Sequence, residues 1–105
     1  MEIIQWYQYI EAFFAGIFLA NTVPHFIHGI SGNKFPTPFA KPHGKGLSSP
    51  LTNILWANFN LLIGYILFRS SEVSADNKIL SIVFFIGILV MSIFSSIHFL
   101  EKHKE

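Results

Sequence analysis

Two long apolar runs in the second half of the chain predict helices. The 22 residues from Ile79 to Leu100 contain no Lys, Arg, Asp or Glu, and neither do the 18 residues from Leu51 to Phe68. Each run reaches the roughly 18 to 20 residues that a helix needs to cross a hydrocarbon core of about 30 Å. We therefore expect helices over about residues 50–69 and 78–100.

A third apolar stretch lies near the N-terminus, and polar residues interrupt it. It predicts a helix over about residues 4–30, in which the part from Ala12 to Ile30 crosses the membrane. Pro24 removes one backbone hydrogen bond, so it should kink this helix. Three aromatic residues near its start are typical of a membrane–water interface: Trp6, Tyr7 and Tyr9.

These spans predict an all-α integral membrane protein with three transmembrane helices in a single domain, residues 1–105. A Pro/Gly-rich basic loop, residues 31–49, connects the first two helices, and a polar tail occupies residues 101–105. Only 12% of the residues are charged, which is about half the usual fraction in soluble domains. A buried helical hairpin in a soluble protein is therefore disfavoured, because too few charged residues remain to solvate an outer surface.

Several classes of protein and site are excluded or disfavoured by composition. The chain has no cysteine, which excludes disulfides and thiolate metal sites. Its net charge of +1 indicates no nucleic-acid partner. The N-terminal segment carries Glu2 and no basic residue, so we interpret the first helix as retained and not as a cleaved signal peptide.

Basic residues are distributed unevenly between the two ends of the predicted bundle. The opposite end from the basic loop has only Arg69 and Lys78, together with two acids. The loop and the tail have five lysines: Lys34, Lys41, Lys45, Lys102 and Lys104. Since basic residues favour the cytoplasmic side, we expect the loop and the C-terminus to be cytoplasmic and the N-terminus to be outside.

The same topology brings polar side chains from all three helices to the cytoplasmic end. Ionisable groups in membrane helices usually face a bundle interior or a cavity, so we expect a ligand-binding pocket there. Asn53 and Ser95 also have simpler interpretations, as helix-packing and back-bonded residues. The candidate pocket residues are His25, His28, Asn53, Ser95 and His98.

The basic loop is a candidate site for an anionic lipid headgroup. Its Gly and Lys spacing does not match the GxxxxGK[ST] pattern of a nucleotide-binding loop. Ordinary positive-inside topology is the competing explanation for its charge. The candidate headgroup-binding residues are Lys34, Lys41, His43 and Lys45.

The HxxH spacing of His25 and His28 places two imidazoles on adjacent turns of one helix face, which is feasible for metal ligation. A third ligand could come from His98 or His43, and we take His25, His28 and His98 as the candidate ligands of a metal ion, haem or a quinone oxygen. No carboxylate follows, so the zinc-protease pattern is absent. We expect no cofactor, with hydrogen-bonding or proton-linked use of the histidines favoured over ligation.

The run PHFIHGISGNKFPTPF, with GLSSP and NILWANFNLLIGY downstream, resembles a group of small uncharacterised bacterial three-helix membrane proteins. The resemblance covers roughly residues 16–68. One departure is Ala57 after Trp56, where the group often has glycine. The resemblance implies a bacterial inner-membrane setting and no particular activity or functional residue.

These observations predict a small non-enzymatic membrane protein that binds a lipid headgroup or a larger membrane complex. Three helices bury little surface, so a homo-oligomer or an accessory subunit is expected. The alternatives are a redox role with haem, metal or quinone, an enzyme with His25 or His28 as general base, and an oligomeric transporter. The enzyme lacks a recognisable acid partner, and the transporter depends on Glu11 as its only membrane-embedded charge.

Overall fold

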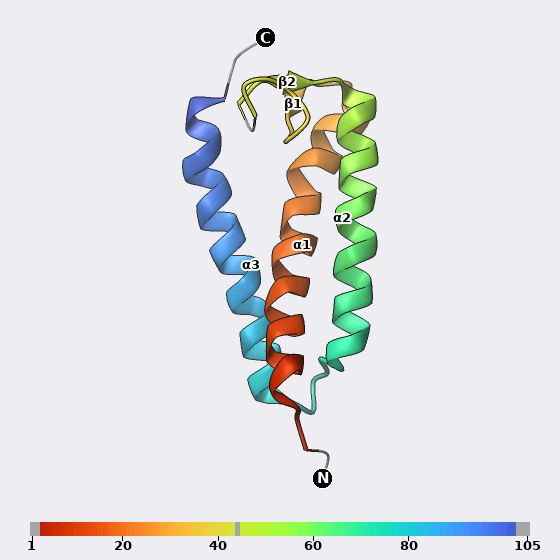
Figure 1. Ribbon diagram of the computed structural model, residues 1–105, viewed down its shortest axis with the longest axis vertical. Coiled ribbons are helices and arrows are strands. Elements are labelled where there is room, and N and C mark those ends of the chain that lie inside the picture. The colour runs from red at the N-terminus through yellow and green to blue at the C-terminus, as the bar shows by residue number, and fades with distance from the viewer. Residues whose placement is uncertain (1–2, 44, 103–105) are drawn as a thin grey trace.

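The computed structural model describes residues 3–43 and 45–102, and it contains three long helices packed side by side (Figure 1). They are α1 (Trp6–Ile30), α2 (Pro50–Ser71) and α3 (Lys78–His98), and a 3-10 turn, η1 (Phe99–Glu101), follows α3. All three are long and apolar enough to cross a membrane. The mostly helical fold predicted from the sequence is thus confirmed, with α2 continuing to Ser71 and α3 ending at His98.

Local side-chain hydrogen bonds fix where the second and third helices begin. The Ser49 hydroxyl accepts a bond of 3.1 Å from the backbone N–H of Thr52, and the Asn77 side chain accepts one of 3.1 Å from Leu80. Such caps satisfy N–H groups that have no partner within the helix. α1 continues through Pro24 to Ile30, and the kink at this proline stays a prediction.

The segment between α1 and α2 contains a structure that the sequence does not predict. Strand β1 (Phe35–Pro36) pairs antiparallel with β2 (Leu47–Ser48), with Phe35 opposite Ser48 and Pro36 opposite Leu47. Strands of two residues are too short to produce an alternating pattern. The resulting hairpin lies across the end of the bundle, at the same end as the C-terminus of α3 (Figure 1).

Glycines determine how closely the helices approach. A Cβ atom on Gly87 of α3 would lie 2.1 Å from the carbonyl oxygen of Phe13 and 3.3 Å from the Cα of Gly16, so α1 and α3 touch there through their backbones. Gly64 and Gly29 make close contacts between α1 and α2 at two levels, against Leu19 and Ile54. α3 diverges from α1 towards the hairpin end (Figure 1), which leaves room for a pocket.

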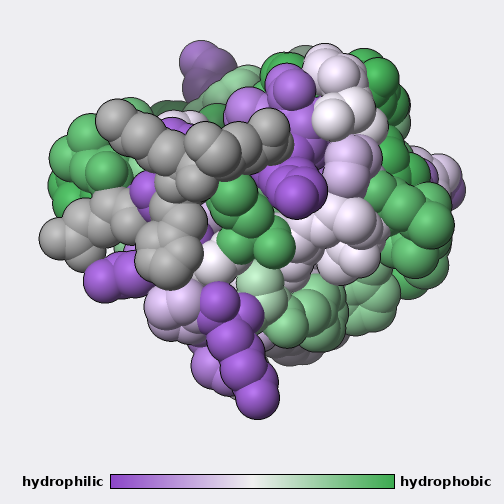
Figure 2. Space-filling view, turned by 90° about the horizontal axis from the view of Figure 1, so that it is seen from above, coloured by the Kyte–Doolittle hydropathy of each residue, from purple (hydrophilic) through white to green (hydrophobic). Residues whose placement is uncertain are grey.

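The interior of the bundle is small and polar, whereas its outer surface is apolar. The buried hydrophobic residues are mostly small, and the fully buried side chains include Asn53 and Asn60. Large apolar side chains such as Phe85, Leu89 and Ile93 are more than half exposed. Figure 2, viewed onto the hairpin end, shows hydrophilic residues on this end and hydrophobic residues around its edge. This distribution is the one expected where interhelical hydrogen bonds hold a bundle together in an apolar surrounding.

Candidate functional site

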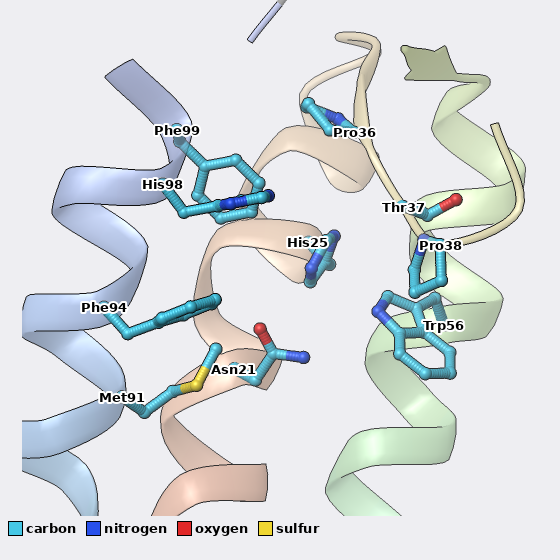
Figure 3. Close-up of a pocket in the computed structure, with 10 residues that line it drawn as sticks. All are labelled: Asn21, His25, Pro36, Thr37, Pro38, Trp56, Met91, Phe94, His98 and Phe99. Atoms are coloured by element: carbon cyan, nitrogen blue, oxygen red, sulfur yellow. The ribbon is translucent and has the colours of Figure 1, made fainter. Parts of the chain in front are cut away.

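A cavity of about 160 Å³ lies between the diverging ends of α1 and α3, next to the hairpin and α2 (Figure 3). Aromatic, proline and methionine side chains form most of its wall, with a few polar groups among them. This is the usual composition of a small-molecule site. Its lining residues are Asn21, His25, Pro36, Thr37, Pro38, Trp56, Met91, Phe94, His98 and Phe99.

His25 is the most buried histidine at this site, with 2% of its surface exposed. Its Nδ1 lies 2.8 Å from Oδ1 of Asn53, a residue with no exposed surface. The Asn53 Nδ2 in turn donates to the carbonyl oxygens of Phe35, Ser48 and Ser49, at 2.9, 3.2 and 3.0 Å. One amide therefore connects α1, the hairpin and the start of α2.

A second hydrogen-bonded pair, formed by two asparagine side chains, lies deeper in the bundle on the same two helices. Asn21 of α1 donates from Nδ2 to Oδ1 of Asn60 at 3.1 Å. The Asn60 Nδ2 donates to the carbonyl oxygen of Trp56, one turn earlier in α2, at 2.8 Å. Asn21 and His25 are one helical turn apart, so the two pairs present their α1 members to the same cavity.

Phe35 of β1 is the centre of an aromatic cluster that holds the hairpin onto the helices. It is 5% exposed, and its ring lies 5.3 Å from His25 and 4.6 Å from Phe99 between ring centroids. The His28 ring stacks on it at 4.3 Å and an angle of 11°. Burial of this single side chain fixes the hairpin over the cavity, since aromatic rings bury large apolar areas.

The structure brings together only part of the candidate pocket. His25 and His98 both line the cavity, and Asn53 lies behind His25. His28 is instead stacked on Phe35, and its buried Nδ1 has no hydrogen-bond partner within the described residues. Ser95 is half-buried and is not among the lining residues of the described cavity.

The three candidate metal ligands do not form a cluster. Among residues 3–43 and 45–102, no group of three His, Cys, Asp or Glu side chains could hold a metal ion. The physical reason is visible at each ring, because His25 bonds through Nδ1 to Asn53 and His28 packs flat against Phe35. His98 stacks on Phe94 at 5.3 Å.

The candidate headgroup residues lie on the hairpin but do not line the cavity that the structure describes. Lys34, Lys41 and His43 are exposed, and Lys45 is half-buried. The His43 Nδ1 donates to the carbonyl oxygen of Pro38 at 2.6 Å, which closes the loop on itself. The cavity wall is formed by the neighbouring residues Pro36 to Pro38. The basic residues and the cavity are therefore separate features of one hairpin.

Glu11 lies at the opposite end of the bundle, near the end of α2. Its carboxylate accepts a hydrogen bond from the Ser70 hydroxyl. The other carboxylate oxygen, Oε1, is buried and has no partner in the described part of the chain. Nearby, the buried Gln8 donates to the carbonyl oxygen of Ser71 at 3.0 Å.

Several cavity residues are not among the candidates that the sequence offers. Asn21 precedes His25 by one turn, and Met91 precedes His98 by two turns, so helical spacing could have suggested both. Trp56 and Phe99 carry no such signal, because aromatic residues are common throughout the chain. The prolines of the hairpin reach the cavity only because β1 pairs with β2.

No protein-family model, curated protein or solved structure matches this chain.

Proposed function

We propose that this chain is a membrane-spanning binding protein without enzymatic activity, which holds a small and largely apolar ligand in the cavity beside His25. The observation that carries this proposal is a cavity of about 160 Å³ with aromatic walls and few polar groups. A cavity of about 150 Å³ is large enough for a benzene molecule. The ligand, or the part of it that is bound, is therefore about the size of one ring.

The hydrogen bond between His25 and Asn53 supports binding rather than acid–base catalysis. The partner of Nδ1 is the neutral amide of Asn53, whereas catalytic histidines are commonly oriented by a carboxylate that stabilises the imidazolium. No Asp or Glu is among the lining residues of the described cavity. The site can thus accept a hydrogen bond, but no carboxylate at the described cavity would stabilise a positive charge on the His25 ring during catalysis.

The membrane setting is supported by the outer surface and by the placement of charge. α1, α2 and α3 each satisfy the length and hydropathy of a membrane span. The exposed lysines of the hairpin, Lys34 and Lys41, would lie at one membrane surface, where they attract anionic headgroups. We propose the cytoplasmic side of a bacterial inner membrane for this surface.

Tryptophan fluorescence tests the proposed binding site. The chain has two tryptophans, Trp6 and Trp56, and only Trp56 lines the cavity. In detergent-solubilised Trp6→Phe protein, bromobenzene should quench the Trp56 emission with a saturable dependence on concentration, because the bromine atom would lie beside the indole.

The matched control is the Trp56→Phe protein, which retains Trp6 as its tryptophan. Trp6 does not line the cavity, and 72% of its surface is exposed. Its emission should fall only in proportion to the bromobenzene dissolved in the detergent. Identical, non-saturable curves for the two proteins would argue that no ligand enters the cavity and would defeat the proposal.

A further inference from the structure

We propose that the cavity selects ligands that donate hydrogen bonds, and specifically a neutral hydroxyl group on an aromatic-sized ring. This inference rests on the proposed binding function, and it names the chemistry of the ligand. It follows from the orientation of two hydrogen-bonded pairs, His25 with Asn53 and Asn21 with Asn60, which present two acceptors to the cavity.

The orientation of Asn53 is fixed by its three carbonyl neighbours. A carbonyl oxygen only accepts hydrogen bonds, so the Asn53 atom facing Phe35, Ser48 and Ser49 must be the amide nitrogen. The amide oxygen therefore faces His25, and the His25 Nδ1 must carry the proton of the 2.8 Å bond. This assigns the tautomer of the ring from its surroundings.

A neutral His25 in this tautomer has a lone pair on Nε2. The neutral form is favoured because the ring is 2% exposed, and a buried charge without a charged partner is costly. In the described residues, the Asn53 bond is the single hydrogen bond of this ring. Nε2 therefore remains as a hydrogen-bond acceptor at the cavity wall.

The same argument applies to the second pair. The Asn60 nitrogen is held by the carbonyl oxygen of Trp56, so the Asn60 oxygen faces Asn21. Asn21 must donate its N–H to that oxygen, which leaves its own Oδ1 as an acceptor. In Figure 3 the Asn21 nitrogen points toward α2, and its oxygen points up toward His25. Within the described residues this oxygen has no hydrogen-bond donor.

Two unpaired polar atoms at the cavity, the Asn21 oxygen and the His25 Nε2, are thus acceptors. The indole N–H of Trp56 is a donor at the same wall, and a hydroxyl group can also accept a hydrogen bond from it. The other polar side chains, Thr37 and His98, have partners of their own. A ligand that only accepts hydrogen bonds would leave these two buried acceptors without a donor. Leaving buried polar groups unpaired costs binding free energy, so the cavity should bind such a ligand less tightly. An ammonium ligand is disfavoured, since no carboxylate lines the described cavity to neutralise it. A hydroxyl group satisfies the wall without burying a charge.

Three brominated rings of similar size test this selectivity in the Trp6→Phe protein. 4-Bromophenol has a hydroxyl group that donates a hydrogen bond, and 4-bromoanisole has an ether oxygen that only accepts one. The methyl group of 4-bromotoluene neither donates nor accepts a hydrogen bond. After correction for partition into detergent, quenching of Trp56 should give a Kd for 4-bromophenol about tenfold lower than for 4-bromoanisole, as one well-placed hydrogen bond allows. 4-Bromotoluene should also bind less tightly than 4-bromophenol.

Two leucine substitutions locate the effect. Asn21→Leu removes one acceptor from the cavity, so the preference for 4-bromophenol should fall about threefold or more. Asn58→Leu changes an exposed asparagine of α2 whose side chain bonds to Ile54 and does not line the cavity, so the preference should be unchanged. The comparison of the three rings in the parent protein needs no substitution and holds even if Asn21→Leu folds poorly.

The outcomes separate the two proposals. Equal or tighter binding of 4-bromoanisole or 4-bromotoluene would overturn the selection of donors while leaving a binding cavity. A second outcome is an unchanged preference for 4-bromophenol both in folded Asn21→Leu protein and in His25→Phe protein. That result would overturn the assignment of the preference to the Asn21 oxygen and the His25 Nε2. Absence of saturable quenching by all three rings would overturn the proposed function itself, and the inference with it.

Discussion

Asn53 connects more parts of this molecule than any single apolar contact described above. Its nitrogen binds carbonyl oxygens of β1, β2 and the residue that caps α2, and its oxygen binds His25 of α1. Every polar atom of the side chain is used, in a position with no exposed surface. Such a fully satisfied buried group specifies one arrangement of its neighbours, because leaving any of them unpaired is costly.

We therefore expect Asn53→Leu to destabilise the protein by about 3 kcal/mol or more, since it leaves several buried partners without a hydrogen bond. The free energy of unfolding can be measured by titration with SDS in mixed micelles, followed by circular dichroism. Asn58→Leu is the matched control, because the same change on the exposed side of α2 should shift it by no more than about 0.5 kcal/mol. Equal effects of the two substitutions would contradict the importance given to the buried amide.

At the scale of the elements, the contact between α1 and α3 determines where the cavity forms. The two backbones meet at Gly16 and Gly87, which lie near the middle of α1 and α3. α2 follows α1 more closely, with contacts at Gly64 and Gly29. Beyond Gly87, α3 diverges from α1 towards the hairpin (Figure 1), which leaves the space that Met91, Phe94 and His98 partly fill.

Gly87→Ala should weaken this contact, because the added Cβ would lie 2.1 Å from the carbonyl oxygen of Phe13, a backbone atom that cannot rotate away. We expect a loss of about 1–3 kcal/mol, as for other overpacked positions. A Cβ atom on Gly64 would instead lie 2.7 and 2.8 Å from Cδ2 and Cγ of the Leu19 side chain, and 3.2 Å from its backbone nitrogen. A shift of that side chain and the higher helix propensity of alanine should make the loss for Gly64→Ala smaller than the loss for Gly87→Ala. Thermal denaturation in detergent distinguishes the two, and a larger loss for Gly64→Ala would contradict the proposed contact.

For the whole molecule, the distribution of charge predicts how the bundle is oriented in a membrane. The hairpin and the C-terminus of α3 lie at one end, and the connection between α2 and α3, residues 72–77, lies at the other (Figure 1). Lysines are concentrated at the first end, whereas Glu72 and Asp76 belong to the second. This asymmetry favours a cytoplasmic hairpin.

Single cysteines can test the orientation, since the natural chain has none. His43→Cys in the hairpin and Ser74→Cys in the connection between α2 and α3 both replace exposed residues. In intact bacterial spheroplasts, an impermeant maleimide should label Ser74→Cys but not His43→Cys, and inverted vesicles should give the opposite pattern. Labelling of both after solubilisation is the control for reactivity. The reversed pattern would contradict the predicted orientation, and labelling of both sites in spheroplasts would contradict a membrane-spanning bundle.

The amino-acid sequence by itself determined the helices. Runs of apolar residues and the Ser-Pro signal before α2 are local properties, and a helix satisfies its backbone hydrogen bonds within the same segment. His25, His98 and Asn53 could be chosen as site candidates for a similar reason, because polar residues in apolar helices are few. The direction of each side chain could not be chosen in this way.

Only the tertiary structure decided which of these groups share a site. Contacts between segments far apart in the sequence pack Phe35 against both His25 and His28, and bring the hairpin residues and Asn21 to the same cavity. The hairpin depends on pairing residues 35–36 with 47–48, which no local pattern encodes. The acceptor character of the cavity likewise comes from carbonyl oxygens of other segments, because an amide or imidazole alone can face either way until its neighbours fix it.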